Sequence, residues 1–300
     1  MTRSACLIFN PVAGQSDPDK DLKKIVSILE PEIELDVQCT TPEKDAGQLT
    51  KTAVERGVQT IIASGGDGTL SAAAGALVET DIPLGIIPRG TANAIASALG
   101  IHDTIKAACQ TILDGKTKKI DMGRCNGKPM VLLAGIGFEA KTVEEADREL
   151  KNNFGMLAYV VSGLQNLNEL EPFEAKIETD ENTVTITATA VTVANAAPPT
   201  SILAQGPAGI VYDDGLLDLT VVTPKDKTNV IAASYELLQS AILGESADHE
   251  DIKYIRTRYV KVTTQPAQKI VLDGEIIGET PIHVDCIPGG LTIFMPMQQD

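Results

Sequence analysis

The segment with the clearest chemical signature is Thr60–Leu70, where an apolar run gives way to two glycines, a carboxylate, a third glycine and a hydroxyl. It reads as a strand that enters a turn and then a helix. Glycines allow close backbone approach, and the first turn of a helix offers unpaired N–H groups to an anion. Since Asp67 would itself repel a phosphate, we expect a divalent cation between them. The pattern predicts metal-assisted nucleotide chemistry rather than a plain strand-to-helix connection.

A second chemical signature is the triplet Asp273-Gly274-Glu275, which follows the apolar run Lys269–Leu272. A glycine between two acidic residues predicts a flexible loop that presents both carboxylates to a cleft. A carboxylate placed in this way is suited to accept a proton from a reacting group. The sequence leaves open which of the two is the base.

The elements that position these residues fall into two patterns, the first of which covers residues 5–125. Short β-branched runs alternate there with amphipathic segments, which is typical of a parallel sheet with intervening helices. The expected strands are Cys6–Phe9, Glu34–Cys39, Thr60–Ala63 and Leu84–Ile87, and the expected helices include Asp19–Leu29 and Pro42–Gly57. The loops that follow three of these strands are Asn10–Gly14, Gly65–Thr69 and Gly90–Asn93. Ligands bind at the carboxyl edge of such sheets, so we expect these loops to form one site.

The second pattern begins near residue 128 and is rich in antiparallel β structure. Its expected strands are Thr183–Val193, Leu216–Val222, Tyr259–Thr263 and Lys269–Leu272, with helical exceptions at Glu144–Leu167 and Asn229–Leu243. The Asn126-Gly127 pair predicts a turn, and we place the domain boundary between Gly123 and Lys128. The active site is expected between the two domains.

Composition restricts the partners of this 300-residue chain. Its formal net charge of -16 disfavours nucleic acid and gives no attraction to anionic lipid. The five cysteines are scattered without metal or disulfide spacing, which favours a reducing cytoplasm. The three histidines are isolated and receive no role, and no apolar run has the length of a transmembrane segment. We therefore expect a cytoplasmic protein that contacts a membrane only transiently. A homodimer is one of the oligomeric states left open.

Five motifs occur in an order that resembles the diacylglycerol kinase catalytic family, especially the soluble bacterial lipid kinases and their sphingosine kinase relatives. They are Asn10-Pro-Val-Ala-Gly14, Gly65-Gly-Asp-Gly-Thr69, Pro88-Arg-Gly-Thr-Ala-Asn93, Asp213-Asp-Gly-Leu-Leu-Asp218 and Asp273-Gly-Glu275. The resemblance spans nearly the whole chain. It implies an α/β nucleotide-binding domain with a parallel sheet at residues 1–125 and an antiparallel β-sandwich domain for the lipid substrate at residues 126–290. A final strand, near Leu291–Pro296 within residues 291–300, would return to the first domain.

The resemblance also assigns roles to individual residues. ATP is placed against Asn10, Pro11, Gly14, Thr40, Gly65, Gly66, Asp67, Gly68, Thr69, Leu70, Ser71, Gly90, Thr91 and Asn93. Asp67 and Asp121 belong to the network of a catalytic Mg²⁺, and Asp273 and Glu275 form the general-base loop. A second, structural Mg²⁺ would take the Asp214 carboxylate and the backbone carbonyls of Val211 and Leu216. For this last site a metal-free hairpin turn at Asp214-Gly215 is an equal alternative.

The implied activity is an ATP- and Mg²⁺-dependent lipid kinase that converts diacylglycerol to phosphatidic acid at a membrane surface. Alternatives are a sphingoid-base or other lipid kinase, an NAD kinase-like enzyme, and a nucleotide-binding protein without turnover. Ala94 departs from the aspartate of many bacterial relatives, although the sphingosine kinase branch also has Asn-Ala there. Glu139 occupies a position that is often acidic near the phosphate-accepting cleft. Ala94 leaves open its effect on activity, and Glu139 leaves the acceptor alcohol undetermined.

Overall fold

The computed structural model describes residues 3–138, 140, 143, 171–198, 201, 204, 209–223 and 252–296. The chain forms two compact units, one of Met1–Ile120 with Gly289–Asp300 and the other of Asp121–Pro288. The helices expected at Glu144–Leu167 and Asn229–Leu243, like Glu139, lie outside the described residues. Among the described residues, no helix combines the length and apolar character needed to cross a bilayer.

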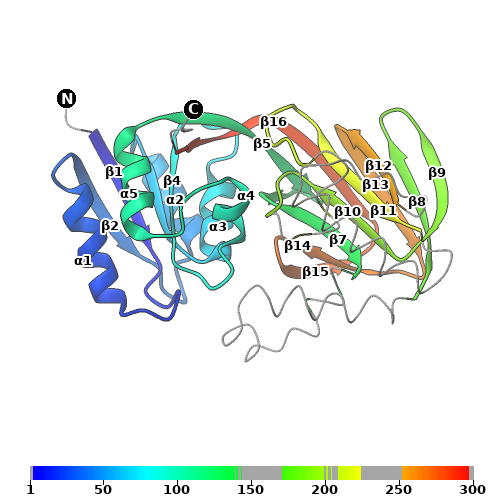
Figure 1. Ribbon diagram of the computed structural model, residues 1–300, viewed down its shortest axis with the longest axis horizontal. Coiled ribbons are helices and arrows are strands. Elements are labelled where there is room, and N and C mark those ends of the chain that lie inside the picture. The colour runs from blue at the N-terminus through cyan, green and yellow to red at the C-terminus, as the bar shows by residue number, and fades with distance from the viewer. Residues whose placement is uncertain are drawn as a thin grey trace. The chain divides into compact units, whose positions relative to one another are not determined.

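The first unit alternates strands and helices, as the sequence predicts (Figure 1). Its elements are β1 (Arg3–Phe9), α1 (Pro18–Leu29), β2 (Ile33–Cys39), α2 (Ala46–Glu55), β3 (Ile61–Gly65), α3 (Asp67–Ala76), β4 (Leu84–Pro88), α4 (Ala94–Ala98) and α5 (Ile105–Asp114). The strands pair in parallel in the order β2-β1-β3-β4. The last part of β16 (Ile282–Phe294) extends this sheet, because Ile293 pairs in parallel with Leu84.

Helices cover both faces of this sheet. The connection from β1 to β2 runs in one direction across the sheet, and the connections from β2 to β3 and from β3 to β4 run in the opposite direction. Because connections between parallel strands are right-handed, α1 lies on one face while α2 and α3 lie on the other. Helices α1 and α5 pack together, and their apolar residues share a core with Leu7 and Phe9 of β1. Helices α2 and α3 pack against each other and against β1 and β3. This doubly wound arrangement leaves the loops at the strand ends free to form a site.

The second helix begins later than the sequence predicts. Residues Pro42–Gly57 were expected to be helical, whereas α2 starts at Ala46. Asp45 is its N-cap and accepts the backbone N–H of Gln48, while the Gln48 side chain accepts the N–H of Asp45. This capping box satisfies two otherwise unpaired backbone groups and fixes the helix start there. Residues 40–44 consequently form a loop beyond the end of β2.

The second unit is built from antiparallel strands. After the hairpin of β5 (Thr117–Cys125) and β6 (Lys128–Met130), one sheet has the order β12-β11-β10-β7-β14-β15, and β8, β9, β13 and the first part of β16 pair in the other. The bounds of these strands are β7 (Leu133–Gly137), β8 (Phe173–Thr179), β9 (Thr183–Ala188), β10 (Ala190–Ala194), β11 (Leu217–Val222), β12 (Ile252–Thr257), β13 (Tyr259–Gln265), β14 (Lys269–Leu272) and β15 (Glu275–Glu279). Asn126 and Gly127 make the hairpin turn with positive φ angles of 49° and 80°, which confirms the turn predicted there.

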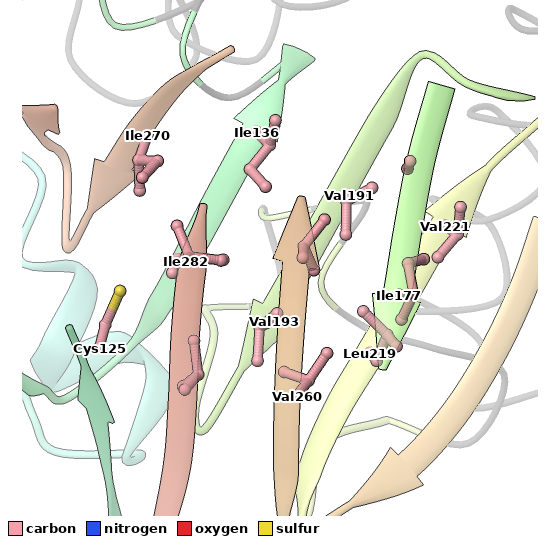
Figure 2. Packing of buried hydrophobic residues seen from close by; sticks show 14 of the residues in the cluster. Cys125, Ile136, Ile177, Val191, Val193, Leu219, Val221, Val260, Ile270 and Ile282 are labelled. Carbon is pink, nitrogen blue, oxygen red and sulfur yellow. The ribbon is translucent and has the colours of Figure 1, made fainter. Parts of the chain in front are cut away.

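A single apolar core joins the two sheets of this unit (Figure 2). Ile136, Val191 and Leu219 come from one sheet, and Ile177 and Val260 come from the other. Alternate residues of each strand point into the space between the sheets, which is the packing of a β-sandwich. The predicted combination of a parallel α/β domain and an antiparallel sandwich is therefore confirmed.

The run Thr183–Val193, expected as one stretch of β structure, is two strands in different sheets. β9 pairs with β8, whereas β10 pairs with β7 and β11. Thr189 lies at the change of sheet, where its N–H bonds to the carbonyl of Val222 at 2.9 Å. Strand β10 is buried at every residue, while β9 is largely exposed. Alternation in the sequence does not show where a chain leaves one layer for the other.

Candidate functional site

Hydrogen bonds tie together the loops that follow β1, β3 and β4. The Asn10 side-chain amide donates to Thr69 Oγ1 at 2.8 Å, which links the first loop to the start of α3. Arg89 Nη1 donates to the Asn10 carbonyl at 2.9 Å, and the Arg89 N–H donates to the Gly65 carbonyl at 2.7 Å. The carboxyl ends of three adjacent strands are therefore held as one polar surface.

Glycines allow the same loops to touch. A Cβ on Gly14 would lie 2.3 Å from the Arg89 carbonyl oxygen, and Gly14 has a φ of 80° that also favours glycine. A Cβ on Gly90 would lie 2.7 Å from the Gly66 Cα. These glycines thus serve contact between loops, which is a structural role in addition to the ligand approach that the sequence predicts.

The converging loops line an open cavity of about 600 Å³. This volume lies within the usual range of small-molecule sites. Eight of the residues predicted to bind ATP line it: Asn10, Gly14, Thr40, Gly66, Gly68, Thr69, Gly90 and Thr91. Side-chain hydroxyls and amides, backbone from glycines and the start of a helix therefore meet in one pocket.

The other residues predicted to bind ATP do not line this cavity. They are Pro11, Gly65, Asp67, Leu70, Ser71 and Asn93. Leu70 is fully buried in the core, and a Cβ on Gly65 would collide with the Thr69 side chain. Asn93 Oδ1 accepts the Gly90 N–H at 2.8 Å, and Asp67 Oδ1 accepts the Ile95 N–H at 3.0 Å. The side chains of Asn93 and Asp67 therefore hold the backbone of the loop after β4 and the start of α4 in position.

Five cavity residues lie outside the predicted loops: Thr41, Pro42, Asp45, Ala46 and Ala72. Four of them belong to the loop after β2 and the start of α2. The capping signature Asp45-x-x-Gln48 can be read from the sequence and would have placed a helix start beside this loop. The carboxylate of Asp45 gives that side of the cavity a negative group.

Arg89 supports the site from beneath. Its side chain is 2% exposed, and its Nε lies 2.9 Å from Asp21 Oδ2 on α1. Its guanidinium carbon lies 4.3 Å from the centre of the Phe9 ring, a cation–π contact. Burial by itself would raise the pKa of Asp21, but hydrogen bonds from Ser16 and Arg89 outweigh it and lower that pKa. Arg89 thus connects α1 to the Asn10 carbonyl.

The Asp273-Gly274-Glu275 triplet is a tight hairpin rather than the flexible loop that the sequence suggested. Leu272 pairs with Glu275, and the two residues between them have φ angles of 47° and 88°. Positive φ at both positions is the geometry of the two-residue turn that Asp-Gly favours. The short turn fixes the backbone of both acidic residues.

The two carboxylates of this hairpin have different surroundings. Asp273 Oδ1 accepts the N–H groups of Leu132 and Leu133 at 2.9 and 3.1 Å, and Oδ2 accepts the Val131 N–H at 2.9 Å. Glu275 begins β15 and is exposed to solvent. Asp273 therefore anchors the hairpin to the chain before β7, whereas the side chain of Glu275 lies in solvent.

The remaining predicted metal ligands lie in the second unit. Asp121 is 2% exposed, and its Oδ2 accepts the Gly215 N–H at 2.6 Å. Asp214 Oδ1 accepts the Leu216 N–H at 3.0 Å, and Val211 is 38% exposed. Asp67 belongs to the first unit, so a shared magnesium network with Asp121 stays a prediction. In the part of the chain that the structure describes, no three His, Cys, Asp or Glu residues form a group able to hold a metal.

In comparison with known proteins, each unit matches the model of a protein family. Residues 4–125 match the diacylglycerol kinase catalytic domain, and residues 133–295 match the YegS C-terminal NAD kinase beta sandwich-like domain. An uncharacterised protein of Synechocystis is 49% identical over 99% of this chain and 71% of its own. A diacylglycerol kinase of Bacillus subtilis is 32% identical over 99% of this chain and 98% of its own.

A solved structure gives the same result for the fold. A putative diacylglycerol kinase from Bacillus anthracis superposes with a TM-score of 0.83 at 27% identity, over 99% of this chain and 97% of that one. Its coverage and that of the Bacillus subtilis relative extend through both units. The chain belongs to the diacylglycerol kinase family of lipid kinases, which are phosphotransferases with an alcohol acceptor.

Proposed function

We propose that this protein transfers the γ-phosphoryl group of ATP to the hydroxyl of diacylglycerol and so forms phosphatidic acid. The observation that carries the proposal is the cavity at the carboxyl edge of the first unit's sheet, lined by Asn10, Thr69 and the glycines of two strand-end loops. Membership of a family with relatives named diacylglycerol kinase supports the acceptor. The protein is expected to work in the cytoplasm and to contact a membrane while it binds its lipid.

The electrostatics of the cavity suggest how a nucleotide would lie in it. Helix α3 begins at Asp67 without a side-chain cap, so its first N–H groups and positive dipole end are available to phosphate. Asp45, on the α2 side of the cavity, would repel phosphate. We therefore assign the triphosphate to the side of Asn10, Gly68 and Thr69. The base or ribose belongs beside Thr40 and Asp45.

Asp67 fits a role beside magnesium. Its Oδ1 accepts the Ile95 N–H at 3.0 Å, while its Oδ2 accepts no hydrogen bond from any described residue. That free oxygen is a suitable ligand or water acceptor for Mg²⁺, which usually keeps several waters and bridges nucleotide phosphates. When bound, the ion would neutralise charge on the transferring phosphoryl group. Asp67 would hold it through one oxygen while the other keeps the start of α4 in place.

Glu275 is the better candidate for the general base. Three backbone N–H groups already occupy lone pairs of Asp273, and proton transfer to that carboxylate would compete with them. Glu275 is exposed and accepts no hydrogen bond among the described residues. We therefore propose that Glu275 accepts the proton of the lipid hydroxyl and that Asp273 positions the hairpin that carries it.

The test is phosphoryl transfer from labelled ATP to a panel of diacylglycerol, sphingoid base, phosphatidylglycerol and NAD, each presented separately. Label on diacylglycerol supports the proposal. Label on sphingoid base or phosphatidylglycerol alone corrects the acceptor, and label on NAD alone rejects lipid phosphorylation. Nucleotide binding without any labelled product would identify a protein without turnover. The Asn10→Ala variant, which removes the link to Thr69, should weaken ATP binding and thereby tie activity to the cavity.

A further inference from the structure

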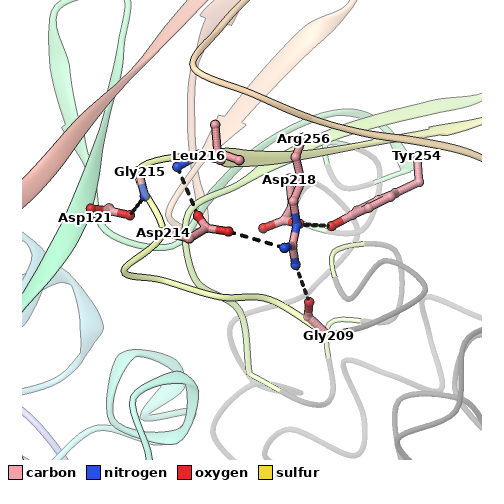
Figure 3. A network of polar contacts seen from close by, with 8 residues as sticks. All are labelled: Asp121, Gly209, Asp214, Gly215, Leu216, Asp218, Tyr254 and Arg256. Atoms are coloured by element: carbon pink, nitrogen blue, oxygen red, sulfur yellow. Dashed lines mark hydrogen bonds and ion pairs between the residues drawn. The ribbon is translucent and has the colours of Figure 1, made fainter.

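A guanidinium group lies beside the turn where the sequence predicts a structural Mg²⁺ and bonds to Asp214 in it (Figure 3). Arg256 Nη1 lies 3.3 Å from Asp214 Oδ2, and Nη2 donates to the Gly209 carbonyl at 3.3 Å. On its other side, Arg256 Nε lies 3.1 Å from Asp218 Oδ1. One cation thus contacts two carboxylates and a backbone oxygen of the segment that precedes and begins β11.

Strand register puts Arg256 in this position. Asp218 on β11 is paired directly with Arg256 on β12, and Thr220 is paired with Tyr254. Residues 254 and 256 share one face of β12, because side chains alternate along a strand. Tyr254 donates its hydroxyl hydrogen to Asp218 and accepts a hydrogen bond from Arg256 Nε at 2.8 Å. The cation is therefore held by the sheet and not by the turn alone.

The turn is closed by bonds within the protein. Asp214 Oδ1 accepts the Leu216 N–H at 3.0 Å, and Asp121 Oδ2 accepts the Gly215 N–H at 2.6 Å. The Asp121 N–H donates to the Tyr212 carbonyl at 2.7 Å. Each carboxylate oxygen of Asp214 thus has a hydrogen-bond or ion-pair partner. Asp121 bonds to Tyr212 at the start of the turn and to Gly215 at its end.

These contacts do not fit a second divalent cation on Asp214. The predicted site supplies a single carboxylate, and that carboxylate already faces a group with a permanent positive charge. A divalent ion beside it would be repelled by Arg256 at a distance where water screens charge incompletely. We propose that Arg256 takes the place of the structural Mg²⁺, so that the segment Gly209–Asp218 folds without a bound divalent ion. Like such an ion, the guanidinium neutralises carboxylates and binds a backbone carbonyl, although that carbonyl belongs to Gly209 and not to Val211 or Leu216.

The protonation states of Arg256 and Tyr254 agree with this assignment, while burial raises the pKa of Asp218 despite its hydrogen bonds with both of them. Burial by itself would lower the pKa of Arg256, but the hydrogen bond with Tyr254 and the charge of Asp218 raise it above its usual value. Burial and the hydrogen bond to Asp218 raise the pKa of Tyr254 to about 12, so this side chain remains a donor at neutral pH. The cation and its hydroxyl neighbour therefore keep their form throughout the physiological range.

The experiment follows thermal unfolding of the full-length protein without nucleotide or lipid, in EDTA and in excess MgCl₂. It is independent of catalysis, so a failed kinase assay would not affect it. We expect Asp214→Asn to lower the unfolding midpoint by several degrees, and by the same amount in both buffers. A loss that is seen in MgCl₂ and disappears in EDTA would show that the ion is the partner of Asp214, and would overturn the proposal.

A double-mutant cycle tests the partner directly. Arg256→Met should lower the midpoint, and combining it with Asp214→Asn should cost less than the two separate losses together, because both remove one contact. If Arg256→Met does not fold, Arg256→Lys serves in its place, since it keeps the charge and loses the planar fork. The control is Lys253→Met, which removes an exposed cation on the same strand. Additive losses, or equal stability of the Arg256 and Lys253 variants, would refute the proposal.

Discussion

Asp273 and Glu275 are separated by a single glycine, yet Asp273 is a hydrogen-bonded anchor and Glu275 is exposed to solvent. Asp273→Asn replaces one acceptor oxygen with an NH₂ group, which leaves unpaired either the Val131 N–H or the N–H groups of both Leu132 and Leu133. Leaving such a group unpaired costs about 1–3 kcal/mol. We expect this variant to unfold at a lower temperature, as measured by circular dichroism, and to lose activity through misplacement of the hairpin.

Glu275→Gln should give the opposite result. Removal of a general base lowers turnover by about 10²–10⁴-fold, while an exposed side chain contributes little to folding. We expect kcat to fall with an unchanged unfolding midpoint. Glu279→Gln, at the far end of the same strand, is the control and should keep full activity. A fully active Glu275→Gln enzyme would exclude this residue as the base.

Arg89 and Asp21 form a pair that should be sensitive to acid. Because the folded state lowers the pKa of Asp21, the pair stabilises the protein above the unfolded pKa of about 3.9, and this stability is lost as the pH falls through the folded pKa. Arg89→Met removes the cation that pairs with the half-buried Asp21 carboxylate and leaves it the Ser16 hydroxyl, and loss of a hydrogen bond to a charged group typically costs about 1.5–3 kcal/mol. We expect a large loss of stability near neutral pH that shrinks in strong acid, as measured by urea unfolding across the pH range.

The matched control for this experiment is Arg56→Met. Arg56 and Asp36 are 2.8 Å apart, but their side chains are 53% and 46% exposed. Exposed pairs contribute about 0–1 kcal/mol. Equal losses from the buried and the exposed arginine would contradict the supporting role of Arg89.

Among the elements of the first unit, the loops after β3 and β4 pass each other at two glycines. Gly90→Ala would put a Cβ 2.7 Å from the Gly66 Cα, whereas Gly66→Ala would put one 3.4 Å from the Gly90 Cα. The first distance requires the backbone to move and the second is an ordinary contact. We therefore expect Gly90→Ala to lower the unfolding midpoint clearly more than Gly66→Ala does. We also expect Gly90→Ala to lower the affinity for ATP. Similar midpoints for the two variants would show that the loops separate easily.

The sequence predicts elements best where local chemistry determines them. Strands β1, β3 and β4 are buried apolar runs bounded by turn residues, so their positions and the meeting of the loops Asn10–Gly14 and Gly65–Thr69 could be predicted. The sequence suggests a flexible loop at Asp273 and does not reveal the tight hairpin, because the amides that hold the Asp273 carboxylate come from residues 131–133. Arg256 was missed for a similar reason. Its partners are set by strand register, which a single sequence does not contain.

For the whole molecule, the net charge of -16 bears on how the enzyme meets its lipid. An acidic protein is repelled by an anionic surface, and salt reduces this repulsion. With diacylglycerol at a constant fraction of the vesicle, we expect the rate to fall as phosphatidylglycerol replaces phosphatidylcholine, and to recover as NaCl is added. The rate is measured as labelled phosphatidic acid formed per minute. A rate that rises with anionic lipid at low salt would indicate a local basic surface that dominates the overall charge.

The pairing of Ile293 with Leu84 has a consequence for biosynthesis. Strand β4 emerges from the ribosome long before its neighbour has been translated, and until then its outer edge offers unpaired N–H and C=O groups to any other nascent chain. The sandwich unit must also be made before the amino-terminal sheet receives its last strand. Chaperone binding to this edge during translation, followed by release once residue 293 has been added, would protect the growing polypeptide from aggregation.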